Sequence, residues 1–202
     1  MSQPTRHLDL GCGAHPRNPY RASAVFGVDI RLPAELRSAS LVEADIVLDG
    51  IPFPDNHFDS VSAFDFLEHV PRQAFSPRTG RTIFPFVDLM SEVWRVLKPD
   101  GLFYGFTPAF PHAAAFQDPT HVNIITVGTH DYFCGGAPAA AVYGFKGRFV
   151  SERVCWTCAK NAEDARDSLR KRLRDLHRRH LRRKVDHLLW ELRADKGSAG
   201  QS

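Results

Sequence analysis

Two carboxylates and two glycines near the start of the chain have the types and spacing of a ligand-binding turn. An apolar run ends in Asp9, and Gly11 and Gly13 follow one residue apart, which lets a strand end sharply with its backbone amides open to a ligand. Asp29 ends a second apolar run 18 residues after Gly11, where doubly wound folds place the carboxylate that binds ribose hydroxyls. Gly-x-Gly also closes ordinary turns, and Pro16 stands where a dinucleotide fingerprint has its third glycine. The prediction of a site therefore depends on the turn and Asp29 together.

A second group of residues could remove a proton from a substrate. The segment Asp118-Pro-Thr-His121 can form a turn that brings a carboxylate to an imidazole, which orients the ring and raises its basicity. Histidine titrates near neutral pH, so His121 is a candidate general base, Asp118 its orienting partner and His69 a second candidate base. An Asp–His hydrogen bond that only stabilises the loop explains the same residues equally well. A metal at Asp118 and His121, with Asn123 or Asp65 as a third ligand, has no support in the spacing, so we expect no metal site.

The composition is that of one ordinary globular domain with a small appendage. The chain has 202 residues, of which 43% are hydrophobic and 24% charged, enough for a substantial core. It has no window of about 18 uninterrupted apolar residues and no apolar leader at its start, so we expect a cytoplasmic protein with reduced cysteines. The single pair Cys155 and Cys158 predicts core packing rather than a redox or zinc site.

Apolar runs alternate with helical or loop patterns over the first half of the chain, which predicts an α/β fold with a doubly wound, mostly parallel sheet. Only residues 11–23 join the first two strands, so we expect a shortened first crossover with a stub of helix or an irregular loop. Apolar positions 86, 89, 90, 93, 94 and 97 have the spacing of an amphipathic helix. The expected strands are His7–Leu10, Ala24–Ile30, Ser40–Val47, Phe58–Phe64 and Leu102–Thr107, and the expected helices are Leu32–Ser40 and Pro85–Leu97.

The last third of the chain predicts further helices and a strand pair. We expect an interrupted helix over Thr129–Ala141, a strand pair formed by Tyr143–Val150 and Glu152–Cys158 that closes the sheet, and a long amphipathic helix over Asn161–Ala194. Residues 166–184 contain 10 Lys and Arg against two acids, so the basic character of the chain belongs to this one segment. The predicted organisation is a main domain over residues 1–160, a helical extension over 161–196 and a disordered tail over 197–202.

Three segments in order carry a family resemblance. They are Ile51-Pro-Phe-Pro-Asp-Asn-His-Phe-Asp59, Leu67-Glu-His-Val70 and Glu92-Val-Trp-Arg-Val-Leu-Lys-Pro-Asp-Gly-Leu-Phe-Tyr-Gly-Phe-Thr-Pro108. They resemble the successive motifs of class I S-adenosylmethionine-dependent methyltransferases, specifically the small type-11 group. The similarity covers roughly residues 6–108, with a looser fit to about residue 158. It implies a Rossmann-like methyltransferase domain over residues 1–160 and S-adenosyl-L-methionine as the cofactor.

The resemblance also implies a role for each position that matches the motifs. Asp29 would accept hydrogen bonds from both ribose hydroxyls, which are strong because the acceptor is charged. Arg17 could pair with the cofactor carboxylate, since His15 and Pro16 depart from the family's glycine loop. The implied cofactor-binding residues are Asp9, Gly11, Cys12 and Gly13 for the methionine moiety, Asp29 and Ile30 for the ribose and its surroundings, Asp45 and Ile46 for the adenine, and Phe64 and Asp65 for the sulfonium.

The residues directly after the fourth strand narrow the choice of methyl acceptor. Methylation of a base amine usually shows Asn/Asp-Pro-Pro-Tyr there, whereas this chain has Asp65-Phe-Leu-Glu68, and it has no Pro-Cys nucleophile for carbon methylation of cytosine. An oxygen, or a nitrogen on a small molecule, remains. The segment around Asp118-Pro-Thr-His121 resembles bacterial methyltransferases of glycan or polysaccharide loci, which implies O-methylation of a sugar hydroxyl or of a glycolipid or polysaccharide precursor.

The basic segment 166–184 allows several partners. A basic amphipathic helix suits the surface of an anionic membrane on its inner face, or the phosphates of RNA, and it could equally pack on its own domain or on a twin helix in a homodimer. One alternative to a sugar O-methyltransferase is therefore an RNA methyltransferase that binds its substrate through this helix. A second alternative, suggested by the shortened first crossover and the small size of any acceptor cap, is a non-catalytic cofactor-binding partner subunit.

Overall fold

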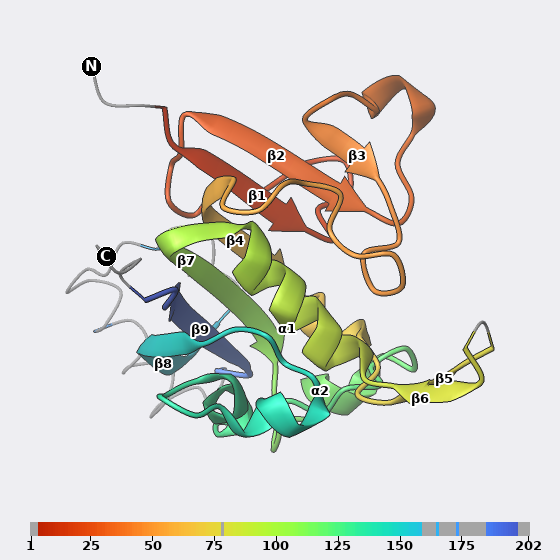
Figure 1. Ribbon diagram of the computed structural model, residues 1–202, viewed down its shortest axis with the longest axis vertical. Coiled ribbons are helices and arrows are strands. Elements are labelled where there is room, and N and C mark those ends of the chain that lie inside the picture. Colours follow the sequence, from red (N-terminus) through yellow and green to blue (C-terminus); the bar gives the residue numbers. More distant parts are fainter. Residues whose placement is uncertain (1–3, 78, 159–164, 166–172, 174–184, 198–202) are drawn as a thin grey trace.

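A seven-stranded sheet in the order β3-β2-β1-β4-β7-β9-β8 organises the chain (Figure 1). The structure is a computed structural model that describes residues 4–77, 79–158, 165, 173 and 185–197. The sheet strands are β1 (Arg6–Leu10), β2 (Ala24–Asp29), β3 (Leu41–Glu43), β4 (Phe58–Phe64), β7 (Leu97–Pro108), β8 (Phe149–Thr157) and β9 (His187–Ala194). The remaining elements are the hairpin β5 (Ala74–Ser76) and β6 (Arg81–Ile83), the helices α1 (Pro85–Val96) and α2 (Ala114–Gln117), and the short 3₁₀ helices η1 (Ala34–Leu36), η2 (Leu67–His69), η3 (Thr129–Phe133) and η4 (Ala139–Tyr143).

The parallel half of the sheet confirms the predicted doubly wound fold. β1 pairs in parallel with β2 on one side and with β4 on the other, and Leu10 lies level with Val28 and Ala63. The chain therefore changes winding direction at β1, and the carboxyl ends of β1 and β4 border the crevice in which ligands of such sheets bind. The predicted strand Ser40–Val47 is shorter than expected, because the Asp45 carboxylate accepts hydrogen bonds from the amides of Val47 and Leu48 and starts a turn.

The first crossover is short, as predicted. Residues 11–23, all of which the structure describes, contain no helix. The loop is instead held by side chains: the Tyr20 hydroxyl donates a hydrogen bond of 2.7 Å to Glu191 of β9, and its ring packs edge-on against Tyr104 of β7. An irregular loop thereby covers the face of the sheet on which a crossover helix would lie.

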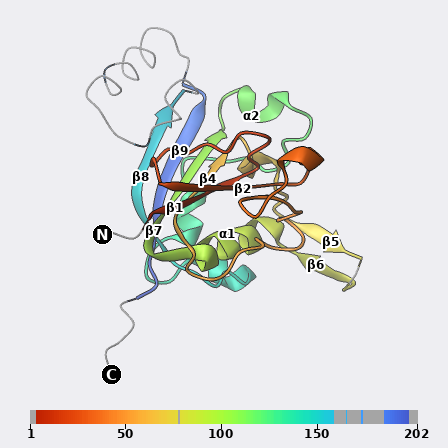
Figure 2. The same cartoon turned by 90° about the horizontal axis from the view of Figure 1, so that it is seen from above.

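The main core lies between the sheet and α1. Figure 2 shows α1 and the β5–β6 hairpin on one side of the sheet and α2 on the other. The helix buries four of the six predicted apolar positions, Phe86, Leu89, Met90 and Val93, and also Val96, whereas Trp94 is only partly buried and Leu97 already belongs to β7. The opposite face carries a smaller cluster of buried residues that includes Phe64, Tyr104, Phe106 and Leu189. None of the helices in the described part of the chain has the length and hydropathy needed to span a bilayer.

The carboxyl-terminal prediction is wrong where it extends the long helix to Ala194. His187–Ala194 forms β9, which enters the sheet antiparallel between β7 and β8. Five of its eight residues are buried, and they lie on both faces of the sheet: Leu188, Leu189, Trp190, Leu192 and Ala194. A strand covered on both faces loses the strict alternation of apolar and polar residues, so positions 188, 189 and 192 fit a helical period as well as a strand. These residues belong to the central sheet rather than to the predicted extension 161–196. The rest of the predicted helix, including the basic segment 166–184, lies almost entirely outside the described residues.

Two neighbouring predictions also need correction. The predicted strand pair is one strand, β8, because residues 143–148 run through η4 and a turn at Gly144, where φ is +97°. The partner of β8 is β9 rather than Tyr143–Val150. The predicted helix Thr129–Ala141 is divided into η3 and η4 by Gly135 and its neighbours, since Gly135 adopts a φ of +86°.

One arginine holds the proline-rich loop before β4 onto α1. The Arg95 guanidinium donates to the backbone carbonyls of Ile51 and Phe53, both at 2.8 Å, and forms ion pairs of 2.7 Å with Glu92 and Asp55. Glu92 in turn accepts a hydrogen bond from the Ile51 amide. The motif Ile51–Asp59 thus has a structural role, since it fixes the start of β4.

We expect Arg95→Met to lower the free energy of unfolding by about 1–3 kcal/mol, because it leaves two carbonyls and a partly buried carboxylate without their donor. Arg148→Met, which removes a single ion pair to Asp195, is the matched control and should cost less than about 1 kcal/mol. Urea unfolding monitored by circular dichroism measures both variants. Equal losses in the two variants would contradict the role assigned to Arg95.

Candidate active site

The turn after β1 is shaped by its two glycines. Gly11 has a φ of +63°, and a Cβ atom there would lie 2.6 Å from the Phe66 ring. Gly13 has a φ of +55°, and its amide donates a hydrogen bond of 2.9 Å to the Asp29 carboxylate. Any other residue at position 11 would be strained and would collide with Phe66. The predicted turn and the predicted strand-end carboxylate are therefore in direct contact.

A buried hydrogen-bonded chain fixes this turn from below. The Asp9 carboxylate accepts hydrogen bonds from the Ser62 hydroxyl at 2.5 Å and from the Arg17 amide at 2.8 Å. The His7 ring lies behind them, with Nε2 2.9 Å from the Ser62 hydroxyl and Nδ1 2.7 Å from that of Ser60. Burial raises the pKa of Asp9 to about 6 and lowers the pKa of His7 to about 4. Asp9 thus ties the end of β1 to β4 and to the far side of the loop.

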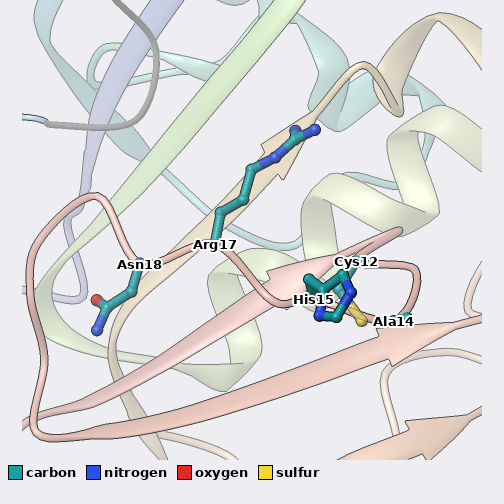
Figure 3. A pocket seen from close by; sticks show the side chains of 5 residues that line it. All are labelled: Cys12, Ala14, His15, Arg17 and Asn18. Carbon is teal, nitrogen blue, oxygen red and sulfur yellow. The ribbon is translucent and has the colours of Figure 1, made fainter.

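The glycine loop lines a cavity of about 530 Å³ (Figure 3). Its walls are Cys12, Ala14, His15, Arg17 and Asn18. The Arg17 side chain extends away from Cys12 and His15 in Figure 3, and its guanidinium lies 4.7 Å from the centre of the Phe64 ring. The guanidinium is thus held over the Phe64 ring at the end of β4. From there Arg17 can form an ion pair with an anionic group of a bound ligand.

The predicted adenosine-side residues gather at the ends of β2 and β3. Asp29 accepts a second hydrogen bond from the Arg31 amide, and the carbonyl of Asp29 accepts one from Ala44, just before Asp45. The Ile30 side chain is 60% exposed, so an apolar surface is open beside Asp29. Ile46 is only 5% exposed and packs in the main core. The Ile46 side chain therefore points into the protein, whereas the Ile30 side chain is exposed to solvent and available to a ligand.

A second cluster lies beyond the end of β4 and β7, where the acceptor side was predicted. The loop after α2 returns to η2, because the amides of Val122 and Asn123 both donate hydrogen bonds of 2.9 Å to the carbonyl of Glu68. This return places the His121 ring edge-on against the His69 ring, with centroids 4.8 Å apart. The two predicted histidines are therefore neighbours.

The prediction that Asp118 orients His121 is wrong in this structure. The Asp118 carboxylate accepts hydrogen bonds from the amide and the hydroxyl of Thr120, at 2.8 and 2.7 Å, and the Thr120 hydroxyl lies 3.0 Å from Nδ1 of His69. His121 Nδ1 lies 3.3 Å from the carbonyl of Ala115. A two-residue Asx turn satisfies Asp118 locally, so its influence reaches His69 instead.

Glu68 is a functional candidate that sequence analysis missed. It is 1% exposed, its Oε2 accepts a hydrogen bond of 2.9 Å from the Thr107 hydroxyl, and its Oε1 lies 3.9 Å from Nε2 of His121. Burial raises the pKa of Glu68 to about 7. The carboxylate beside His121 is thus Glu68. Its place between a strand end and His69 was visible in the sequence, but a buried carboxylate was not.

Comparisons with known proteins agree with this geometry. The family model described as "Methyltransferase domain", type 11, matches residues 8–105. A comparison with curated protein sequences returned no match. Among solved structures, the chain resembles the putative methyltransferase in a Haloferax volcanii complex with the Trm112 methyltransferase activator, with a TM-score of 0.56 and 16% identity over 99% of this chain and 86% of that one.

Two further structures show the same fold at low identity. One is a SAM-dependent methyltransferase from Archaeoglobus fulgidus, with a TM-score of 0.54 and 17% identity over 95% of this chain and 86% of that one. The other is phosphoethanolamine N-methyltransferase 2 from Haemonchus contortus in complex with S-adenosyl-L-methionine, with a TM-score of 0.55 and 16% identity over 98% of this chain and 50% of that one. Residues 8–105 are a methyltransferase domain of the type-11 group, and the chain is a class I S-adenosylmethionine-dependent methyltransferase.

The methyltransferase has one more polar cluster at the same edge of its sheet. His187, at the start of β9, lies 3.1 Å from the carboxylate of Asp65 and 2.7 Å from that of Asp186, and its ring stacks on Phe106. Burial lowers the pKa of His187, but the hydrogen bonds to the two carboxylates outweigh it, so the pKa is raised. Sequence analysis missed His187 because it placed this residue in a helix. The predicted site residue Asp65 is thereby tied to β9.

The pH dependence of methyltransferase stability should separate His7 from Asp9. The folded state resists protonation of His7 down to about pH 4, so this residue stabilises the protein above pH 6.5 and loses that contribution as pH falls. Asp9 does the opposite, because the folded state holds its proton up to about pH 6. We compare the free energy of unfolding of each variant with that of wild type at the same pH. Between pH 7 and about pH 4.5 this difference should shift by about 2 kcal/mol in favour of His7→Gln and by about 2 kcal/mol against Asp9→Asn.

Urea unfolding at pH 7.0, 5.5 and 4.5 measures these two opposed slopes. Both variants should be compared with the wild-type protein at each pH, so that contributions from all other groups cancel. If the stabilities of His7→Gln and Asp9→Asn changed in parallel with pH, the buried chain at the turn would not have the protonation states described here.

Proposed function

We propose that this methyltransferase transfers the methyl group of S-adenosylmethionine to a hydroxyl of a sugar, or of a glycolipid or polysaccharide precursor. The observation that supports this proposal is the buried Glu68 carboxylate beside two imidazoles, His69 and His121, at the carboxyl edge of the sheet. A hydroxyl is a poor nucleophile until its proton is removed, so its methylation requires basic groups of this kind. The segment Asp65–Glu68 lacks the motif usual for base amines.

The proposed cofactor site follows the turn and the strand ends. Asp29 would bind both ribose hydroxyls, and the residues around Gly11, Cys12 and Gly13, fixed by Asp9, would hold the methionine moiety. Arg17, already lying over the Phe64 ring, is placed to meet the cofactor carboxylate as it enters. The adenine would lie against Ile30, with Asp45 near its amine and Ile46 supporting the site from the core, and Phe64 and Asp65 would border the sulfonium.

His121 is the proposed base, and its hydrogen bonds define its free nitrogen. A carbonyl oxygen can only accept, so the contact with Ala115 assigns the proton of the neutral His121 ring to Nδ1. Nε2 then carries the lone pair on the side of Glu68. His69 remains the second candidate, and Asp118 acts on it through Thr120 as a positioning residue. Because methyl transfer is an in-line displacement, these groups need only align the hydroxyl and take its proton.

The two other candidate functions are an RNA methyltransferase and a non-catalytic cofactor-binding partner subunit. The similarity to a methyltransferase that is solved with an activator supports a role for a partner protein. RNA could bind the basic segment 166–184, which lies outside the described residues except for Leu173. The same segment could hold the protein at the inner, anionic face of a membrane, or pair two chains. A cytoplasmic location with peripheral attachment is part of this proposal.

The ribose contact predicts a specific loss of cofactor affinity. We expect Asp29→Asn to weaken binding of S-adenosylhomocysteine by about 10- to 100-fold, because hydrogen bonds to a charged acceptor contribute about 1.5–3 kcal/mol. The amides of Gly13 and Arg31 donate to different oxygens of Asp29, and asparagine keeps an acceptor for only one of them, so circular dichroism and thermal unfolding must verify that the variant is folded. Isothermal titration calorimetry measures the affinity, with Asp49→Asn as the control on the same edge. An affinity within twofold of wild type would refute the assignment.

The acceptor class can be tested with labelled cofactor. The full chain is incubated with radiolabelled S-adenosylmethionine and, separately, with sugar nucleotides, lipid-linked sugars and structured RNA. Label in a sugar fraction is expected, whereas label found only in RNA would reject the proposal. His121→Ala should retain affinity for S-adenosylhomocysteine and lose at least 100-fold in kcat. His112→Ala, whose ring packs on Trp156, is the control and should stay active.

A further inference from the structure

Three side chains lie close together in the arrangement of metal ligands at the acceptor edge, by which we mean the ends of β4 and β7 with η2 and the loop after α2. One carboxylate oxygen of Glu68 and one ring nitrogen each of His69 and His121 all lie within 4.8 Å of one another. They come from two separate parts of the chain, η2 and the loop that returns to it. From this arrangement we propose that Glu68, His69 and His121 form a binding site for a divalent transition-metal ion of the zinc type.

The buried carboxylate supplies an independent observation. Glu68 is 1% exposed, and its Oε1 has no hydrogen-bond partner, although its Oε2 is satisfied by Thr107. Leaving a buried carboxylate oxygen without a partner costs several kcal/mol when the group is charged, so native proteins pair such atoms or use them to hold an ion. The unsatisfied oxygen is the one that faces Nε2 of His121. A cation between these two atoms would satisfy both.

The histidines are oriented from behind, as metal-binding imidazoles are. The Thr120 hydroxyl donates its proton to Asp118, so the neutral His69 ring must donate to Thr120 from Nδ1, which leaves the lone pair on Nε2. The carbonyl of Ala115 does the same for His121. In metalloproteins the second nitrogen of a ligating histidine is usually bound by a carbonyl or a carboxylate, which fixes the tautomer and raises the basicity of the ligand. In the proposed site the Asp118-Pro-Thr-His121 turn supplies one of these hydrogen bonds, the one between Thr120 and His69, and the ligand His121 itself.

The donor set selects the class of ion. Two imidazoles and one carboxylate suit zinc and neighbouring transition metals, whereas magnesium and calcium prefer oxygen ligands. Three protein ligands leave a fourth position of a tetrahedral ion open for a substrate oxygen. Ligands of such an ion lie about 3.3 Å apart at bonds of about 2.0 Å. The cluster must therefore contract by about 1.5 Å at its widest when an ion binds, through small shifts of the half-buried His69 and His121 side chains.

The site deepens the proposed function, and its chemical role rests on that function. An ion in the open cluster would bind the acceptor hydroxyl and lower its pKa, so that the proton passes to solvent before the oxygen attacks the methyl group. The bond between sulfur and methyl breaks as the new oxygen–carbon bond forms, and S-adenosylhomocysteine leaves. His121 would serve in this case as a ligand rather than as the direct proton acceptor.

Cobalt is a suitable probe, because its visible absorption reports both the ligands and their number. The full chain, freed of metal by dialysis against a chelator, is titrated with Co²⁺ and, by calorimetry, with Zn²⁺. We expect one ion per chain, with micromolar affinity or tighter and absorption bands typical of a four-coordinate ion with nitrogen and oxygen ligands. A near-ultraviolet thiolate band would assign the ion to cysteines and overturn the proposal, as would the absence of binding.

Variants locate the ion. Glu68→Gln, His69→Gln and His121→Gln should each weaken binding by at least 10-fold, and Thr120→Val should weaken it by about 10-fold through His69. His112→Gln is the matched control and should bind as wild type does. Thermal unfolding and binding of S-adenosylhomocysteine verify that each variant is folded. Wild-type metal affinity in any two of the three ligand variants would overturn the site.

The outcomes also separate this inference from the proposed function. If the protein methylates a sugar hydroxyl at full rate in the presence of a chelator, with no metal bound, the function stands and the chemical role of the ion is rejected. If the ion binds at these residues but no sugar accepts the methyl group, the site stands and the acceptor class is wrong.

Discussion

The buried Asp9 carboxylate is the contact on which the cofactor side of this methyltransferase depends. Other doubly wound proteins place a helix directly after the first glycine turn, and the helix fixes the turn. Here residues 11–23 form an irregular loop, so the turn needs another anchor. Asp9 provides it by accepting hydrogen bonds from Ser62 of β4 and from the Arg17 amide at the far side of the loop. The cost of burying this carboxylate appears as its raised pKa.

The second anchor of the loop comes from the far end of the chain. Tyr20 binds Glu191 of β9, and Glu191 also forms an ion pair of 3.0 Å with Arg153 of β8. Since β9 lies between β7 and β8, the end of the chain is built into the sheet that carries the site. His187, the first residue of β9, reaches Asp65 beside the end of β4. The cofactor turn and the acceptor edge thus both depend on a strand about 180 residues away in sequence from the turn.

How far each feature could be predicted from the sequence depends on how locally it is determined. The strands that end near Asp9, Asp29 and Phe64 were predicted correctly, because an apolar run followed by a glycine or a carboxylate marks both the strand and its end through neighbouring residues alone. β9 was missed because a strand covered on both faces loses its period-two pattern. The Asp118–Thr120 turn was expected as an Asp–His pair, since spacing alone does not show which hydroxyl or ring a carboxylate reaches. Glu68 was missed because its burial comes from Thr107 and the returning loop, which tertiary structure alone brings together.

Glu68 has two roles at the acceptor edge, one for its backbone carbonyl and one for its side chain. Its carbonyl accepts hydrogen bonds from Val122 and Asn123, which fix the return of the loop, while its side chain faces His121. The Asn123 amide group donates in turn to the carbonyl of Leu67. Because the loop is held by main-chain atoms, the loop should keep its position when the Glu68 carboxylate is replaced by an amide of the same shape. The position of His121 and the charge beside it are therefore separable properties, and an effect of Glu68→Gln on metal or methyl transfer would report the charge.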